Sequence, residues 1–246
     1  MSRSRDSLLA GLRARIRRIE RGEAAAHAVL PLGVAAVDAA LPGGGLARGA
    51  VHEVAGSAAG GFAAMVAGRL GGGVLWCVPA ASRRVLYGPG LAAFGLDTDA
   101  LVIVRCAARR DMLWAMEEGL REPALAAVIG EPDRAVSLTA SRRLQLAAET
   151  SGVTGLILRP DNEASALAPS AVFSRWRVEP APMAGSVDTP PSAARWRLAL
   201  LRCRGGFAGA GRRWTVEWRD AADNLSLVPE PADRPAAPAG ECRRAG

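Results

Sequence analysis

A glycine-rich turn contains the residues whose types and spacing come closest to known chemistry. Gly56 and Gly61, with Gly60 beside them, fit the two glycine positions of the phosphate-loop pattern G-x-x-x-x-G-K-[ST]. A loop of this kind binds phosphate through backbone N–H groups at the start of a helix. Phe62 replaces the lysine of the pattern, and Ala63 replaces its hydroxyl residue. The turn therefore keeps the glycines of a phosphate site and lacks the two side chains that act on a nucleotide and its magnesium.

No other stretch points to catalysis or to a metal. The two histidines, His27 and His52, have no cysteine or carboxylate at ligand spacing, and both are interpreted as structural. The sequence contains neither a G-x-S-x-G nor an H-E-x-x-H motif, and its four cysteines form no C-x-x-C pair. We expect no metal and no disulfide, and we expect a protein of a reducing compartment. Without a signal peptide or a long apolar run, the expected location is the cytoplasm.

The elements that must position the turn alternate between predicted strands and predicted helices. Short apolar runs at 51–54, 74–78, 101–105, 126–129 and 155–158 predict buried strands, and helical patterns at 62–69, 91–94, 111–121 and 139–150 lie between them. Gly152 is expected to end the last of these helices. Such alternation predicts an α/β fold with a mainly parallel sheet flanked by helices.

After Pro160 the period changes to two. The segments 175–178, 195–198 and 213–218 each alternate tryptophan and aliphatic residues with charged residues. This alternation is typical of half-buried antiparallel strands, so we expect such strands at the C-terminal end of the sheet. Trp196 and Trp214 share the aliphatic phase of their strands, which favours the core over stacking on bases of single-stranded nucleic acid.

Three regions follow from these patterns. Residues 1–28 include a basic amphipathic helix at 7–21, which packs on protein, on this domain or on a partner, in preference to a membrane. Residues 29–228 form the α/β domain with the degenerate phosphate loop. Residues 229–246 are rich in Pro, Ala and Arg, and we expect them to be a disordered tail.

The charge balance favours acidic partners or polyanions. The formal net charge is +7, and every basic residue is arginine, since the sequence has no lysine. Guanidinium groups form bidentate hydrogen bonds to phosphate and carboxylate. The candidate contacts to DNA or to a partner are nine arginines in the first helix, in the helix at 139–150 and around the late strands: Arg13, Arg17, Arg18, Arg142, Arg143, Arg202, Arg204, Arg212 and Arg213.

Longer segments resemble known families. The run LPLGVAAVDAALPGGGLARGAVHEV before the turn resembles the RecA core, as do LYGPGLAAFGLDTDALVIVRC, RWRLALLRCRGG and RRWTVEW. From about residue 30 to 228 the chain is similar to the ImuA family of translesion-synthesis accessory proteins. The pieces that carry this similarity are LPGGGLARGAVHE, LYGPGLAAFGLD, LWAMEEGLR, LTASRRLQLAAETSGVTGLILRP and LLRCRGG. The resemblance implies a RecA-like domain with added antiparallel strands.

The RecA resemblance also identifies where catalytic carboxylates would lie. The strand at 74–78 corresponds to the one that carries a glutamate in active enzymes, and here it runs into Pro79-Ala80-Ala81. The Walker B strand corresponds to 125–129, which Gly130 and Glu131 follow. Phosphoryl transfer depends on positioned charges, and losing one such group commonly costs ~10²–10³ in rate. We therefore expect no ATPase activity, no catalytic residue and no cofactor, with residual ATP binding disfavoured.

The ImuA resemblance implies a non-catalytic accessory role in damage-induced mutagenesis, the SOS response. The implied partners are an inactive Y-family polymerase homologue (ImuB), an error-prone DnaE-type polymerase and RecA itself. The loops that correspond to the DNA-binding loops of RecA are short or acidic here, so we expect any DNA contact to be weak. The alternatives are a SulA-like inhibitor of cell division and a nucleotide-dependent recombinase-like ATPase.

Overall fold

The computed structural model describes residues 27–82, 85–159, 168–182, 193–204, 211–219 and 224–228. The predicted helix at 7–21 and the predicted tail at 229–246 lie outside these residues. No helix in the described ranges is long and apolar enough to cross a membrane.

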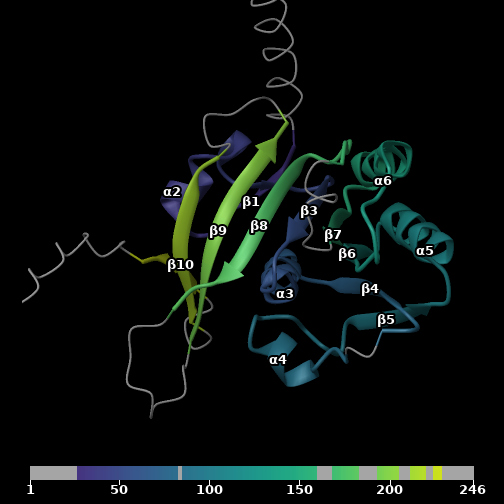
Figure 1. Ribbon diagram of the computed structural model, residues 1–246, viewed down its shortest axis with the longest axis horizontal. Helices are drawn as coiled ribbons and strands as arrows, with labels where there is room; N and C mark the ends of the chain where they lie inside the picture. The colour runs from purple at the N-terminus through teal and green to yellow at the C-terminus, as the bar shows by residue number, and fades with distance from the viewer. Residues whose placement is uncertain are drawn as a thin grey trace, which may run out of the picture.

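One mixed sheet of nine strands organises the described residues (Figure 1). Six neighbouring strands, in the order β8-β3-β7-β6-β4-β5, run parallel, and β9, β10 and β11 extend the sheet beyond β8 by antiparallel pairing. This arrangement confirms the predicted RecA-like α/β class. The strands are β3 (Val51–Ala55), β4 (Gly73–Pro79), β5 (Leu101–Cys106), β6 (Leu125–Gly130), β7 (Thr154–Leu158), β8 (Ser174–Pro180), β9 (Ala193–Cys203), β10 (Arg213–Arg219) and β11 (Asn224–Leu227).

The helices that connect the parallel strands also agree with the predictions. They are α3 (Ala59–Leu70), α4 (Gly88–Ala92), α5 (Arg109–Arg121) and α6 (Leu138–Ser151). The Ser137 hydroxyl caps the start of α6 by accepting the Ala140 N–H at 3.3 Å, and Gly152 ends it with φ +84°. Before β3 lie a two-stranded hairpin of β1 (Val29–Leu30) and β2 (Leu46–Ala47), the short helix α2 (Ala35–Asp38) and a 3₁₀ turn, η1 (Pro42–Gly44).

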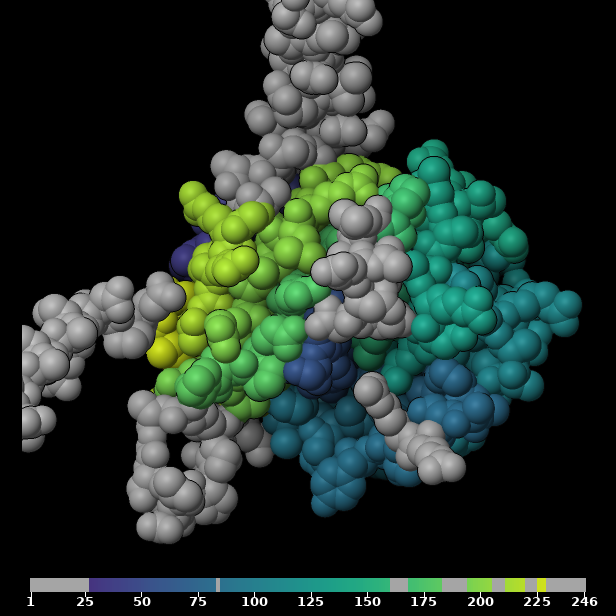
Figure 2. All heavy atoms as spheres, in the orientation of Figure 1, coloured from purple at the N-terminus to yellow at the C-terminus, as the bar shows by residue number. Residues whose placement is uncertain are grey.

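Two apolar cores lie on opposite faces of the sheet. Because successive strand residues point to opposite faces, neighbours such as Val128 and Ile129 belong to different cores. α3 covers one face, and α5 and α6 lie side by side on the other (Figure 1). In the space-filling view the late strands and the helices α5 and α6 form opposite halves of the molecule (Figure 2).

The late strands cover α3 with tryptophans. Trp176, Trp196, Trp214 and Trp218 are all buried in the core that contains α3, as the alternation predicts. The prediction for 175–178 was wrong in one respect. That strand, β8, is antiparallel only to β9 and is parallel to β3 on its other side, so it lies inside the sheet where parallel and antiparallel pairing meet.

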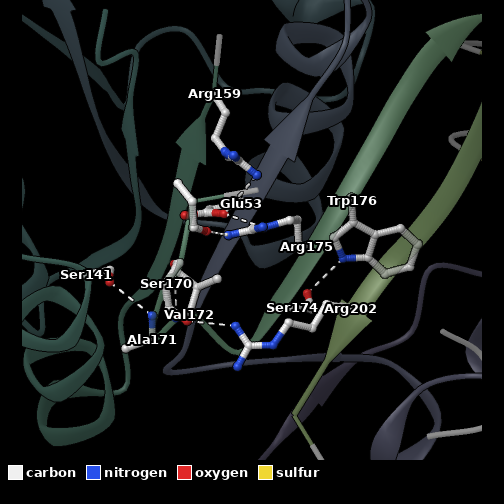
Figure 3. A network of polar contacts seen from close by, with 11 residues as sticks. Glu53, Ser141, Arg159, Ser170, Ala171, Val172, Ser174, Arg175, Trp176 and Arg202 are labelled. Atoms are coloured by element: carbon white, nitrogen blue, oxygen red, sulfur yellow. Dashed lines mark hydrogen bonds and ion pairs between the residues drawn. The ribbon is translucent and has the colours of Figure 1, made fainter. Parts of the chain in front are cut away.

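Because β8 lies inside the sheet, its charged face is not solvated as the alternation suggested. Arg175 is buried, and its Nε donates to Glu53 Oε2 at 2.7 Å across the β3–β8 pair. Arg159, at the end of β7, places Nη1 3.2 Å from the same oxygen. The side chains of Glu53 and Arg159 are each 2% exposed. One carboxylate thus joins three neighbouring strands, as Figure 3 shows.

The opposite face of the same strands contains a buried neutral histidine. His52 Nε2 lies 2.8 Å from the Ala47 carbonyl oxygen, and its Nδ1 lies 2.6 Å from Ser174 Oγ. A carbonyl can only accept, so Nε2 carries the proton and Nδ1 accepts from the serine hydroxyl. The Trp176 N–H donates to that same hydroxyl at 2.8 Å. Burial lowers the pKa of His52 to about 4.

The Glu53 cluster predicts a large stability effect. Glu53→Gln removes the only carboxylate that these described contacts give to Arg159 and Arg175, and leaves two guanidinium groups in the interior. Breaking a buried ion pair from one side typically costs about 3–5 kcal/mol, and we expect that loss in the free energy of unfolding measured with urea. The control is Glu118→Gln, which removes an exposed pair with Arg121 and should change the free energy by under about 1 kcal/mol. Equal effects of the two substitutions would contradict the role of Glu53.

His52 predicts a pH dependence. The pKa of His52 is about 4 in the folded chain, against an ordinary value of 6.5 for histidine, so the unfolded chain binds more protons between these values. The free energy of unfolding should therefore fall as the pH is lowered from about 7 to about 4, and the part due to His52 is about 3 kcal/mol. In His52→Gln this part should disappear, so the pH profile of chemical denaturation should be flatter. A variant profile parallel to that of the wild type would refute the assignment.

Candidate functional site

The glycine turn lies where a phosphate loop would lie, between β3 and α3 at the carboxyl end of the parallel strands. Gly56 has φ +102°, a conformation that disfavours any side chain. A Cβ there would also come within 2.2 Å of the Val178 carbonyl oxygen on β8. The local backbone therefore requires glycine because β8 passes very close to the turn.

Protein groups accept hydrogen bonds from three amides of the turn, those of Ser57, Ala58 and Ala59. The Ser57 N–H and hydroxyl both donate to Glu179 Oε2, at 3.4 and 3.0 Å. The Ala58 N–H donates to the Val178 carbonyl at 3.2 Å, and the Ala59 N–H donates to the Gly56 carbonyl at 3.2 Å. Helix α3 begins at Ala59, within the span of the pattern. A carboxylate from β8 thus lies beside the amides that would hold an anion in a phosphate loop, and its charge repels phosphate.

The two positions that depart from the pattern lie in the core. Phe62 and Ala63 are both completely buried. The Phe62 ring centroid lies 6.0 Å from that of Trp176 and 6.3 Å from that of Trp196. These distances are typical of packed aromatic pairs. The side chain that replaces the lysine therefore points into the interface between α3 and the late strands.

The other two glycines of the predicted site lie on α3, beside Phe62. A Cβ at Gly61 would contact Phe94 at 3.0 Å and Trp196 at 3.2 Å, so the absence of a side chain lets these rings approach the helix. A Cβ at Gly60 would meet no atom within 4 Å. The structure brings Gly56, Gly60 and Gly61 into one turn, as the pattern predicts, and shows that packing accounts for two of them.

Glu131, the acid after the Walker B-like strand, accepts a hydrogen bond from the Trp76 indole N–H at 2.8 Å. This contact bridges the ends of β4 and β6, and the adjoining Pro79 and Ala80 bring no carboxylate. Burial raises the pKa of the Cys77 and Cys203 thiols to about 12, so neither is a ready nucleophile. No group of three His, Cys, Asp or Glu residues suited to a metal occurs in the described part of the chain.

Six of the nine predicted basic contacts lie in the described part of the chain, and three of these six are engaged in intramolecular contacts. Arg13, Arg17 and Arg18 lie outside the described residues. Arg142, Arg212 and Arg213 are exposed. The other three are engaged within the chain: Arg143 pairs with Glu117, Arg202 donates to the Ser170 carbonyl at 2.7 Å, and Arg204 pairs with Glu149 at 2.9 Å.

Arg202 and Arg204 fix the segment that leads into β8. The Arg204 guanidinium also donates to the Ala171 carbonyl at 3.3 Å, and the Ala171 N–H donates to Ser141 Oγ at 3.0 Å. Part of this network appears in Figure 3, where Arg202 reaches the segment from β9. These contacts connect α6 to the late strands, a structural use that the sequence pattern did not reveal.

Known proteins similar to this chain were found by sequence. No family model matches it. Protein ImuA of Caulobacter vibrioides strain NA1000 / CB15N is 35% identical over 254 residues, covering 93% of this chain and 100% of the relative. Protein ImuA of the C. vibrioides strain ATCC 19089 / CIP 103742 / CB 15 matches to the same extent.

The packing of Phe62 predicts the result of a direct test. Phe62→Ala should lower the free energy of unfolding by about 3–5 kcal/mol, because it leaves a cavity between α3 and two tryptophans. Urea denaturation measures the loss. The matched control is Tyr87→Ala, an aromatic residue that is 70% exposed, which should change the value by under about 0.5 kcal/mol. Indistinguishable denaturation curves for the two variants would rule out a core role for Phe62.

Proposed function

Since the chain belongs to the ImuA family, we propose that it is a non-catalytic accessory protein of damage-induced translesion DNA synthesis, which acts by binding other proteins. Membership of this family supports a role in the DNA-damage and mutagenesis pathway. The mechanism and the partners are the proposal.

One observation carries the non-catalytic part. At the turn where a nucleotide would bind, the Ser57 amide and hydroxyl face the Glu179 carboxylate, and Phe62 packs among tryptophans. A phosphate would have to displace the carboxylate, and it would find neither the lysine nor the hydroxyl that supports phosphoryl transfer. This geometry favours a RecA-like domain whose surface binds other proteins and whose turn does not act on a nucleotide.

The proposed partners are the inactive Y-family polymerase homologue, the error-prone DnaE-type polymerase and RecA. Direct DNA binding is secondary in this proposal. Of the six predicted contact arginines that the structure describes, Arg143, Arg202 and Arg204 are engaged in intramolecular contacts. A phosphate backbone is bound by clustered, available cations, so this arrangement favours protein partners. The helix predicted at 7–21 is the proposed docking element for the polymerase homologue.

The first test combines turnover with binding. The purified chain is assayed for ATP hydrolysis with and without single-stranded DNA, and the expected rate equals that of the buffer blank. Any turnover is compared with that of Glu131→Gln, because Glu131 is the acid that follows the Walker B-like strand. Hydrolysis that co-purifies with the chain would overturn the non-catalytic proposal. Loss of that hydrolysis in Glu131→Gln would place it at the Walker B-like strand, and hydrolysis that the substitution leaves unchanged would place it elsewhere in the chain.

The same preparation is used in pull-downs against the polymerase homologue, RecA, a cell-division GTPase and single-stranded DNA. We expect capture of the polymerase homologue by the whole chain and loss of that capture when residues 1–22 are deleted. Circular dichroism and a cooperative urea transition establish that the shortened chain is folded. Undiminished binding by the deletion variant would reject the docking element, and selective capture of the GTPase would reject the proposed pathway role.

A further inference from the structure

The helices α5 and α6 lie side by side on the face of the sheet opposite α3 (Figure 1). A groove runs between them. Two hollows, of about 690 and about 440 Å³, lie along it, and residues from both helices line each of them. The hollows share Glu117 and Arg143, so they adjoin at that point. The turn between β3 and α3 contributes nothing to either lining, and none of the contacts described for that turn uses this groove.

Apolar side chains form the walls of the groove, and two of them, Trp114 and Leu146, are exposed to solvent. Trp114 on α5 is 64% exposed and Leu146 on α6 is 47% exposed. Leu113, Leu144 and Ala147 continue the lining. A large aromatic residue exposed beside an apolar depression is typical of a recognition surface, because tryptophan is the most common type of energetic anchor at interfaces.

Basic residues outnumber acidic ones at the groove, where Asp111 pairs with Arg110 and Glu118 pairs with Arg121. Four arginines line the two hollows, and the one acidic residue that lines them is Glu117. The Glu117 carboxylate is already held by Arg121 at 2.5 Å and by Arg143 from the facing helix. Both arginine side chains are more than half exposed, and that of Arg110 is 91% exposed. The exposed N–H groups of these arginines can donate hydrogen bonds to carboxylates of a partner.

We propose that this groove binds an acidic amphipathic helix of another protein. Apolar residues of the helix would sit between Trp114 and Leu146, and flanking carboxylates would meet the arginines of both rims. A groove between two helices of about four turns suits an occupant of similar length, about 20 Å. The proposal goes beyond the proposed function and stands without it, since neither ATP nor the polymerase homologue enters the argument.

Charge and apolar surface argue against the other occupants. The predicted helix at 7–21 of this chain carries Arg13, Arg15, Arg17, Arg18 and Arg21 against Glu20, so the arginines of the groove would repel it. Nucleic acid is disfavoured because aliphatic side chains such as Leu113 and Leu146 line the hollows beside Trp114, and a phosphate backbone has no apolar surface to match them. An acidic helix satisfies both the apolar and the basic components.

The test uses the whole chain and three synthetic, fluorescein-labelled peptides of about 16 residues. The first is an acidic amphipathic helix, with leucine on one face and glutamate beside it. The second replaces every glutamate with lysine, and the third keeps the acidic composition in scrambled order. Fluorescence anisotropy should show saturable binding of the first peptide alone. The affinity should fall several-fold between low and physiological salt, because opposite charges attract across the interface.

Groove variants locate the site. Trp114→Ala and Leu146→Ala should each weaken binding of the acidic helix at least about tenfold, which is the effect of losing an anchor residue. The matched control is Leu227→Ala, since Leu227 is 48% exposed on β11, at the opposite end of the sheet from β5. This variant should bind as the wild type does, and the urea transitions of all three variants should be unchanged.

Three results would overturn the proposal. They are no binding up to millimolar peptide, equal binding of the scrambled or lysine peptide, and groove variants that bind like Leu227→Ala. A labelled single-stranded oligonucleotide is titrated in parallel. Binding of the oligonucleotide that depends on Trp114, with no binding of the acidic helix, would assign the groove to nucleic acid instead.

Discussion

Glu53 forms ion pairs with two buried arginines at the point where the sheet changes from parallel to antiparallel pairing. A single carboxylate contacts Arg159 from β7 and Arg175 from β8, and it lies on β3, between those strands. Desolvating three charges is costly, and the ion pairs offset that cost only when the three strands keep their register. The cluster thus fixes β8 against β3, and the position of β8 determines both the glycine turn and the core around α3.

The position of β8 determines the glycine turn through two neighbouring residues of that strand, Val178 and Glu179. With β8 in register, the Val178 carbonyl lies against Gly56 and the Glu179 carboxylate reaches Ser57. On the opposite face, Trp176 packs against Phe62. The turn therefore keeps the backbone of a phosphate loop, and its role here is to pack against β8. Gly56 is needed because β8 passes close by, and β8 also accepts hydrogen bonds from the amides of Ser57 and Ala58.

Much of this arrangement could be predicted from the sequence, because periodicity reports burial. Each parallel strand and each tryptophan-bearing strand followed from its apolar pattern, and Gly152 marked the end of α6. Arg175 could not be placed correctly. Alternation indicates which residues share a face and does not indicate what covers that face. Here the segment before β8 covers it, and the Ala168 carbonyl accepts a hydrogen bond from Arg175.

The hydrogen bonds between Ser57 and Glu179 also could not be predicted from the sequence. The two residues are 122 positions apart, and no local pattern links a serine in a turn to a glutamate near the end of a strand. The replacement of the lysine by Phe62 was visible, and the motif showed what had been lost there. The packing of Phe62 against the tryptophans of β8 and β9 became visible only in the structure.

The arginines differ in what their strand or helix faces, so the net charge alone does not show which of them are available to a partner. Arg159 and Arg175 stabilise the interior, and Arg202 and Arg204 hold the entry to β8. Arginine suits these positions because its planar group donates in several directions at once. Some of the arginines behind the +7 net charge of the sequence therefore make contacts inside the fold. The arginines beside the α5–α6 groove are different, because they lie next to exposed apolar walls. Such a combination of charge and apolar surface is more specific to a protein helix than to a phosphate backbone.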